Sequence, residues 1–282
     1  IDAYAKATPE SKTKDIETLV KYLMIPARED SEKVRSIFTW ETSHITYDWA
    51  AYQNGTYSSQ QSATTLKRRK GVCQNFSDLF TDLCNAAGLE AHTISGYAKS
   101  NVDNSWMLYG FTSINHAWNV VKVNNHWELM VVTWAQNIGS TIYFMADPKI
   151  FREDHLPAET KWQMMRDTIS LKQFEHQPIL DDGYKSLGIT HLTPMASSIK
   201  GNIAGRQAKK FVFEFDCKKN LDVKARVSDY YHSKEAKGSQ VITHTGNHYK
   251  LELTIENEGT YWVILSEKSY FVDIASYVLI TE

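Results

Sequence analysis

The sequence predicts an α+β domain followed by a small all-β sandwich. Three patterns carry this prediction: apolar residues at helical spacing over the first third, a β-hairpin pattern in the middle, and period-two strands beyond a polar stretch at residues 193–209. A chain of 282 residues is long enough for two domains. We therefore expect the first domain over residues 1–195 and the β-sandwich over residues 205–282.

The first third of the chain contains three predicted helices. The first covers residues 13–24, and Pro26 ends it. The second starts near Asp30 or Ser31, which are both good N-caps. The third follows Cys73, carries apolar residues at helical spacing, and should stop at Gly88. Residues 46–65, between the second and third helices, are rich in Tyr, Ser and Gln. We expect a surface excursion here, that is, an exposed connecting segment in a position to border a cleft.

Strand patterns begin after Gly88. Residues 91–97 predict one strand, and two β-rich runs at 116–123 and 126–134 flank Asn124-Asn125, which predicts a hairpin with a tight turn. A short strand is expected within residues 141–147. Six further candidates make up the predicted sandwich, over residues 211–215, 221–227, 240–243, 249–255, 261–265 and 270–280.

Composition and charge exclude several functional classes. Hydrophobic residues make up 42% of the chain and charged residues 23%, which is ordinary for a globular protein. The net charge of −2 gives no electrostatic case for a nucleic acid or an anionic membrane as a partner. No apolar run reaches the roughly 18–20 residues that a transmembrane helix needs.

The chain start and the cysteines suggest where the protein works. The first residue is Ile1 and no signal peptide follows, so removal of an export signal is one explanation, and we expect a periplasmic or extracellular location. The three cysteines cannot all pair with one another and do not have zinc-site spacing. Cys84 and Cys217 are expected to be structural. We expect no metal and no cofactor.

Cys73 is the strongest candidate for chemistry. It lies at the first turn of the predicted third helix, where the helix dipole and unpaired N–H groups should lower the pKa of a thiol. The basic run Arg68-Arg69-Lys70 precedes Cys73. Two roles are open for this run: a loop surface exposed to solvent, or a clamp for the substrate. The alternative is that Cys73 is a small core residue. A cysteine nucleophile also needs a base, and His116 opens a predicted strand that is able to pack on this helix.

The motifs around these two residues resemble a known family. Gly71-Val72-Cys73, Gly96-Tyr97, His116-Ala117-Trp118-Asn119 and Thr133-Trp134 resemble the transglutaminase-like domain of the papain-like cysteine peptidase superfamily. Residues 151–178 resemble its kyphoscoliosis-peptidase-like branch, so the resemblance covers roughly residues 30–180.

The resemblance implies a fold and a mechanism. A helix bearing the cysteine packs against an antiparallel sheet bearing the histidine. Cys73 would attack an amide or ester carbonyl and form a thioester, and His116 would act as general base and then as general acid, at roughly 3–4.5 Å from the sulfur. The backbone N–H of Cys73 would contribute to an oxyanion hole.

The third triad position departs from the family. The resemblance places an aspartate where this chain has Val131. A valine accepts no hydrogen bond, so it can neither orient the imidazole nor stabilise its charged form. Thr133 offers only an uncharged hydroxyl. Nothing in the sequence brings another acid to the site, although Asp48, Asp103 and Asp147 are available.

Three further residues are candidates for a substrate cleft. Trp118 should share a face with His116, Gln74 follows the nucleophile, and Tyr97 ends the preceding strand. Each has a simpler alternative, since Trp118 could belong to the core and Gln74 could cap the helix or face solvent. The remaining histidines, including His155, read as surface or structural residues.

Two functions follow from these observations. Val131 favours a weakly active or non-catalytic module that binds a peptide, a protein or a glycan. The retained Cys73 and His116 favour the alternative, a cysteine peptidase or amidase, or a transglutaminase-type acyl transferase, that works with a Cys73–His116 dyad.

Overall fold

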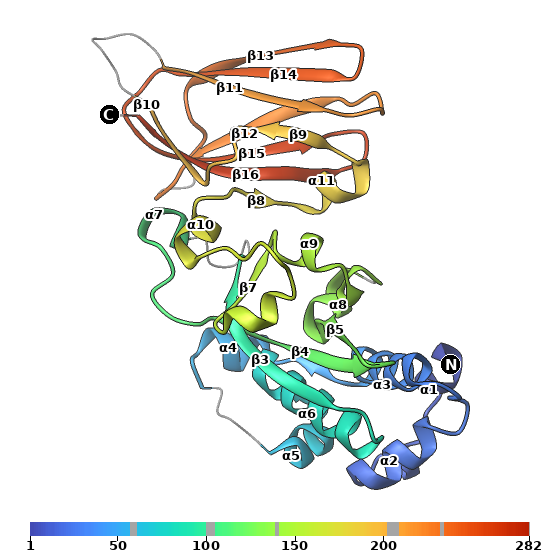
Figure 1. The fold of residues 1–282 in the computed structure, drawn as a ribbon. Helices are drawn as coiled ribbons and strands as arrows, with labels where there is room; N and C mark the ends of the chain where they lie inside the picture. The colour runs from blue at the N-terminus through green and yellow to red at the C-terminus, as the bar shows by residue number, and fades with distance from the viewer. Residues whose placement is uncertain (57–60, 100–104, 139–140, 202–208, 232–233, 282) are drawn as a thin grey trace. The chain divides into compact units, whose positions relative to one another are not determined.

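The structure is a computed structural model that describes residues 1–56, 61–99, 105–138, 141–201, 209–231 and 234–281. The chain divides into two compact units (Figure 1). Unit 1 comprises residues 1–98 and 113–168, and unit 2 comprises residues 99–112 and 169–282. In the described part of the chain, no helix is long and apolar enough to cross a membrane.

Unit 1 combines helices with one antiparallel sheet. Its helices are α1 (Asp2–Lys6), α2 (Ile16–Leu23), α3 (Asp30–His44), α4 (Trp49–Gln53), α5 (Ser62–Arg68), α6 (Cys73–Ala86), α8 (Val132–Ile138) and α9 (Pro148–Phe151). Short 3-10 turns are η1 (Glu10–Lys12), η2 (Thr141–Tyr143) and η3 (Thr160–Gln163). The sheet has the order β6-β5-β4-β3-β7, with β3 (Ala91–Ala98), β4 (His116–Val123), β5 (His126–Met130), β6 (Phe144–Ala146) and β7 (His155–Pro157). A separate parallel pair joins β1 (Thr46–Tyr47) to β2 (Lys70–Gly71).

Helix α6 is the element that fixes the candidate site in unit 1. The Asn75 side chain accepts from the N–H of Val72 at 3.1 Å and caps the start of the helix, and Gly88 takes a positive φ of 78° just beyond its end. The apolar face of α6 is fully buried and packs on β3 and β4. Asn119 of β4 donates to the carbonyl of Ser77 at 2.8 Å. The predicted arrangement, a cysteine-bearing helix on an antiparallel sheet, is confirmed.

The second strand of the predicted hairpin is shorter than expected. The sequence predicted a strand over residues 126–134, but β5 ends at Met130 and α8 begins at Val132. The β-branched residues in this segment favour a strand locally. Tertiary contacts override that preference, because α8 packs on α3 and the Gln136 side chain donates to the carbonyl of Thr42 at 3.2 Å and to that of Ile45. The strand prediction for residues 131–134 was therefore wrong.

Unit 2 is a sandwich of two sheets, as predicted. The first sheet has the order β10-β16-β15-β12, with β8 also on β16, and contains β8 (Ile179–Leu180), β10 (Ser198–Gly201), β12 (Val223–Asp229), β15 (Gly259–Glu267) and β16 (Val272–Thr281). The second has the order β13-β14-β11-β9, and contains β9 (Thr190–Thr193), β11 (Lys209–Asp216), β13 (Gly238–Thr245) and β14 (His248–Ile255). Its helices are α7 (Trp106–Tyr109), α10 (Leu171–Glu175) and α11 (Asp182–Leu187).

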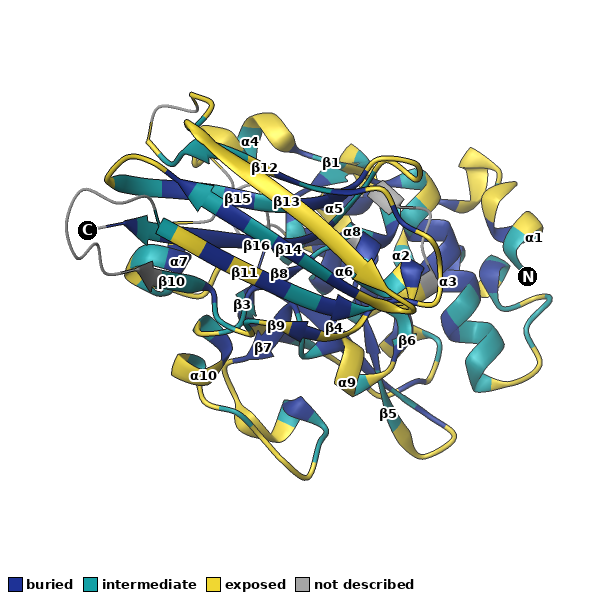
Figure 2. Cartoon of the chain, turned by 90° about the horizontal axis from the view of Figure 1, so that it is seen from above, coloured by how far each residue is buried: buried dark blue, intermediate teal, exposed yellow. Residues whose placement is uncertain are grey.

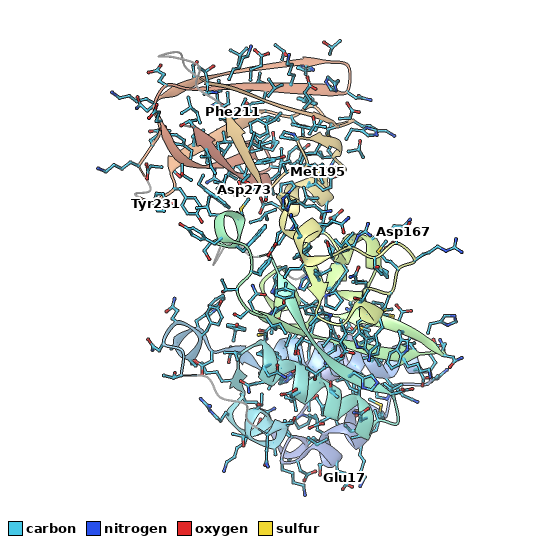
Figure 3. The ribbon with its side chains drawn as sticks, turned by 60° about the vertical axis from the view of Figure 1, so that its left-hand side comes forward. Glu17, Asp167, Met195, Phe211, Tyr231 and Asp273 are labelled. Carbon is cyan, nitrogen blue, oxygen red and sulfur yellow. The ribbon has the colours of Figure 1, made fainter. Side chains whose placement is uncertain are left out.

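Period-two patterning builds the core of the sandwich. Alternate residues of β11, among them Phe211 (labelled in Figure 3), Phe213 and Phe215, are buried, and so are alternate residues of β14. The unit begins earlier than the predicted division at 195 and 205, because β8 and β10 pair with β16 and β9 pairs with β11. Residues 202–208, in the predicted linker, lie outside the described residues.

Candidate functional site

Cys73 and the start of β4 meet in unit 1. The Cys73 sulfur accepts hydrogen bonds from the backbone N–H of Ala117, the residue after His116, and from the N–H groups of Gln74 and of Cys73 itself. The Tyr47 side chain provides a further hydrogen bond to it. The fold therefore brings the two predicted catalytic residues to one place.

The pKa of the Cys73 thiol is raised, whereas the sequence predicted that it would be lowered. Burial is the largest cause, since a thiolate loses hydration in the protein interior. The N–H groups at the helix terminus and the Tyr47 side chain act in the opposite direction but do not outweigh burial. Burial therefore favours the neutral thiol, and the direction of the pKa shift predicted from the helix terminus alone was wrong.

His116 is also held in its neutral form. The residue is 9% exposed, and burial, followed by the neighbouring His155, moves the pKa of its imidazole well below the usual value, while the charge of Asp154 acts in the opposite direction. The Nε2 atom of His116 has no hydrogen-bond partner, and no hydrogen bond joins Cys73 to His116 in the described residues. The two residues of the predicted dyad are thus not hydrogen-bonded to each other, and burial moves both pKa values in the direction that favours the neutral forms.

A second histidine lies beside His116. The His155 ring centroid is 5.4 Å from that of His116, and the Trp134 ring is equally close. His155 Nδ1 contacts Asp154 Oδ1 at 2.5 Å, and the Tyr143 hydroxyl donates to the other oxygen of Asp154 at 2.9 Å. His155 is fully buried at its side chain. A buried imidazole–carboxylate pair therefore neighbours the candidate base.

Sequence reasoning missed this pair. It treated His155 as surface or structural and did not consider Asp154. The pairing of β7 with β3, which itself pairs with β4, brings both residues to the site. The available signal was an acidic residue directly before a histidine, at the start of a segment already assigned to the family resemblance.

The residue at the expected third triad position, Val131, supplies no hydrogen bond to His116. Val131 is fully buried, and its N–H donates to the carbonyl of Tyr143 at 2.9 Å. Thr133 is buried as well, and its hydroxyl has no partner in the described residues. The Val131 departure read from the sequence therefore has no substitute on the same segment.

The aspartates considered as substitutes are occupied elsewhere. Asp48 caps α4 through the N–H of Ala51 at 3.1 Å and forms ion pairs with Arg68 and Lys70 at 3.5 and 3.1 Å. Asp147 caps α9. Asp103 lies outside the described residues. The ion pairs also show that Arg68 and Lys70 hold the loop before Cys73 in place.

Arg69, the third member of the basic run, has a structural role too. Its backbone takes a left-handed conformation with φ of 57° at the end of α5. Its guanidinium pairs with Glu10 at 3.3 Å, donates to the Thr13 hydroxyl, and lies 5.2 Å from the centre of the Trp40 ring. The basic run is therefore tied into unit 1 and is not arranged as a clamp for an anionic substrate.

The predicted cleft residues have different surroundings. Trp118 is fully buried, and a Cβ added at Gly96 would lie 2.4 Å from its ring, so only glycine permits this packing. Trp118 supports His116 from within the core and offers no surface to a substrate, which corrects that part of the prediction. Gln74 is half-buried and donates to Asp78 at 2.9 Å, and Tyr97 is half-buried opposite Leu156.

An aromatic cluster on the excursion at residues 46–65 borders Cys73. We define it as Tyr47, Trp49 and Tyr52, whose ring centroids lie 4.6 to 6.1 Å apart. Trp49 is 44% exposed, and Tyr47 reaches the Cys73 sulfur. The sequence placed this excursion beside a cleft but did not single out these rings. Through Tyr47 they connect the thiol to the exposed ring of Trp49.

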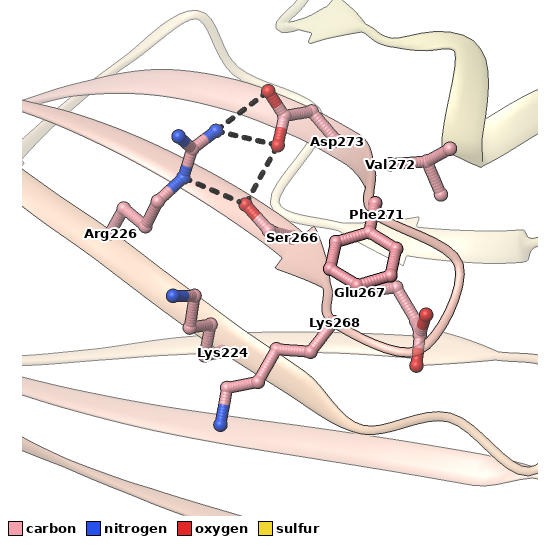
Figure 4. Close-up of a pocket in the computed structure, with 8 residues that line it drawn as sticks. All are labelled: Lys224, Arg226, Ser266, Glu267, Lys268, Phe271, Val272 and Asp273. Atoms are coloured by element: carbon pink, nitrogen blue, oxygen red, sulfur yellow. Dashed lines mark hydrogen bonds and ion pairs between the residues drawn. The ribbon is translucent and has the colours of Figure 1, made fainter.

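A hollow on unit 2 has different chemistry (Figure 4). Arg226 donates to Ser266 at 3.1 Å and forms two bonds with Asp273 at 2.6 and 2.7 Å. The other lining residues are Lys224, Glu267, Lys268, Phe271 and Val272. No cysteine or histidine lines this hollow, so we place the candidate active site in unit 1. Across the described residues, no three His, Cys, Asp or Glu side chains come together as metal ligands.

Comparisons with known proteins show which sequences this chain is similar to. Residues 17–130 match the transglutaminase-like superfamily. Human kyphoscoliosis peptidase is 29% identical over 211 residues, which cover 71% of this chain and 32% of that protein. Hillarin of Drosophila melanogaster is 24% identical over 230 residues, covering 70% of this chain and 28% of that protein. The chain thus spans about a third of the length of these relatives.

Solved structures are similar only in part. A crystal structure of a TGase shares 20% identity with a TM-score of 0.33, covering 45% of this chain and 34% of that one. The assignment therefore depends on the sequence matches together with the helix, the sheet and the positions of Cys73 and His116. With its transglutaminase-like match over residues 17–130, the chain is similar in sequence to the kyphoscoliosis peptidases of human and mouse.

Proposed function

We propose that this protein is a transglutaminase-like module that binds a peptide or protein segment beside Cys73 and turns over amide bonds slowly or not at all. The observation that carries the proposal is the pairing of a neutral thiol with a neutral imidazole that is not hydrogen-bonded to it. The thiolate is the nucleophile in cysteine chemistry, and forming it here requires a proton transfer that no hydrogen bond prepares. Val131 adds no charge to favour that transfer.

The aromatic cluster supplies the binding surface in this proposal. Tyrosine and tryptophan are enriched at protein interfaces because they bury a large area with few rotatable bonds. Trp49 is exposed while Tyr47 and Tyr52 support it from two sides. An extended segment with an apolar side chain packed on Trp49 would lie close to Tyr47, which is hydrogen-bonded to the thiol. A glycan, the other partner class that the sequence suggests, would use the same rings.

A catalytic function is the second candidate, and one observation favours it. Asp154 lies close enough to raise the basicity of His116, and it is bonded to the adjacent His155. In this alternative Cys73 attacks a carbonyl carbon, the thiol proton passes to His116, and the amine leaves with that proton as the thioester forms. Water then hydrolyses the thioester. Export from the cytoplasm remains a prediction under either function.

Peptide selection followed by a cleavage assay separates the two functions. Peptides selected from a random library on the full chain should bind Trp49→Ala at least tenfold more weakly, since an exposed aromatic anchor is removed. Cys73→Ala should bind as the unchanged protein does, and mass spectrometry should find the bound peptides intact. Phe271→Ala is the matched control, because Phe271 is an aromatic residue 92% exposed on unit 2.

Two results would contradict the binding proposal. Cleavage of a selected peptide that disappears in Cys73→Ala would establish the catalytic alternative. Equal loss of binding in Trp49→Ala and Phe271→Ala would show that the aromatic cluster is not the binding surface.

A further inference from the structure

The outer edge of β13 has no partner strand in the described part of the chain. β13 ends the four-stranded sheet of unit 2 and pairs only with β14 among the described strands. All eight of its residues are exposed, and Figure 2 shows it as a continuous yellow strand. An exposed edge of this length presents a row of backbone groups that another strand is able to pair with.

Backbone hydrogen bonds at the two ends of β14 establish which backbone groups of β13 point outward. The N–H of Glu256 donates to the carbonyl of Lys237, and the N–H of Cys217 donates to the carbonyl of Asn247. Because bonded pairs alternate along antiparallel strands, the first bond assigns Val241 and Thr243 to the ladder with β14. The outward backbone groups of β13 are then those of Gln240, Ile242 and His244.

The corresponding edge of the other sheet is closed. The Gln240 side chain accepts from the N–H of Ala225 at 2.7 Å and donates to its carbonyl at 3.0 Å, as a neighbouring strand would. Further along β12, the carbonyl of Val227 accepts from Ala236 at 3.1 Å, and the N–H of Asp229 donates to Lys234 at 2.7 Å. The chain therefore covers the β12 edge and leaves the β13 edge bare.

The far edge of the β13 sheet is also protected. β9 has four residues, shifts register against β11 and is followed by Pro194. Short edges, irregular register and proline all hinder the addition of a strand. β13 has the sequence Gly-Ser-Gln-Val-Ile-Thr-His-Thr, without lysine, proline or a carboxylate. Of these three edges, only β13 has none of the features that block pairing.

We propose that β13 is a dimerisation strand, and that its outer edge pairs antiparallel with β13 of a second copy of this chain. The strand is self-complementary about Ile242, which would face the same residue of the partner while Gln240 faces the partner's His244. Such pairing opposes no two carboxylates or ammonium groups. It also shields Val241 and Ile242, which are 55% and 38% exposed.

Two further features favour a second copy as the occupant. The net charge of −2 on 282 residues gives little repulsion between copies. Twofold pairing of β13 with β13 uses the outer edges of both copies completely, so the product of this pairing is a closed dimer and not a filament. The two four-stranded sheets would become one continuous sheet across the twofold axis.

Sedimentation of the full chain over a range of concentrations tests the proposal. We expect a monomer–dimer equilibrium that Ile242→Lys weakens at least tenfold, because the two introduced ammonium groups would lie directly opposite one another. Val212→Lys is the matched control: Val212 is 39% exposed on β11, an interior strand of the same sheet, and its replacement should leave the dimer intact. Circular dichroism checks that both variants fold.

Two more variants test the pairing itself. Ile242→Pro removes an outward N–H without removing a bond to β14, so it should abolish the dimer and keep the fold. Ile242→Cys should form a disulfide-linked dimer under mild oxidation, because paired Cα atoms at such a site are about 5.5 Å apart. Val212→Cys should not form this dimer. A chain that stays monomeric at every concentration would overturn the proposal, and this holds even if β13 binds added peptides. An Ile242→Lys variant that dimerises like the unchanged protein would overturn it as well.

Discussion

The two units differ in how they treat buried polar atoms. In unit 1 several such atoms without partners gather near the candidate site, among them His116 Nε2, Thr133 Oγ1 and His155 Nε2. In the described part of unit 2 only Trp106 Nε1 and the Tyr277 hydroxyl are of this kind. Leaving a buried polar atom unpaired costs about 1–3 kcal/mol. Unit 1 therefore keeps polar chemistry at the expense of stability, as functional sites do, while unit 2 is an apolar scaffold.

The largest effect that would sharpen this contrast comes from Val131→Asp. If residue 131 is the acid position, an aspartate there should increase hydrolysis of a peptide or amide library by up to about 10⁴-fold, the loss seen when triad acids are removed. The variant should also unfold at a lower temperature, since Val131 is fully buried and a carboxylate there loses hydration.

Val132→Asp is the control for that variant. Val132 is 2% exposed, so its replacement carries a similar burial cost at a neighbouring position. Both variants should lower the melting temperature, and only Val131→Asp should raise turnover. Equal turnover in the two variants would show that residue 131 is not the acid position.

A core truncation in unit 2 should give the next largest effect. Phe213 is fully buried in the sandwich, and Phe213→Ala should lower the free energy of unfolding by about 3–5 kcal/mol, measured by hydrogen exchange at β14. Val212→Ala, on the exposed face of the same strand, should change it by no more than about 0.5 kcal/mol. Similar losses from both substitutions would contradict the description of unit 2 as an apolar scaffold.

The smallest effect concerns a buried carboxyl group of unit 1. Glu41 on α3 is fully buried, its carboxyl oxygens have no hydrogen-bond partner among the described residues, and burial raises its pKa well above the usual 4.5. The folded state therefore holds the proton more tightly than the unfolded state. The contribution of this group to stability is complete below pH 4.5 and is lost as the pH rises toward the raised folded pKa, by about 1.4 kcal/mol per pH unit.

Glu41→Gln tests this pH dependence. The free energy of unfolding is measured by denaturant titration at several pH values. In the variant, the decrease in this free energy with rising pH that Glu41 causes should disappear. Glu17→Gln, at a highly exposed position on α2, is the control and should leave the slope unchanged. An unaltered slope in Glu41→Gln would mean that Glu41 is ionised in the folded protein.

Local patterns in the sequence predicted the parts of the fold that depend on near neighbours. The apolar spacing after Cys73 predicted α6, and the runs around Asn124-Asn125 predicted β4 and β5. Long-range packing decided the rest. Burial of Cys73 reverses the pKa direction that the helix terminus alone suggests, and the approach of Asp154 to His116 depends on the pairing of β7 with β3.

Residues 105–112 interrupt unit 1 in the sequence but belong to unit 2, which constrains how the protein is made. Trp106 and Met107 of α7 are buried with Ile179 and with Val278, which lies close to the C-terminal end of the described chain. During synthesis these two apolar side chains leave the ribosome long before Ile179 and Val278 are synthesised. Their burial is therefore delayed until the segment that contains Val278 has been made. A fragment that ends at residue 195 would keep Trp106 but lose Val278, and no single cut divides the chain into its two units.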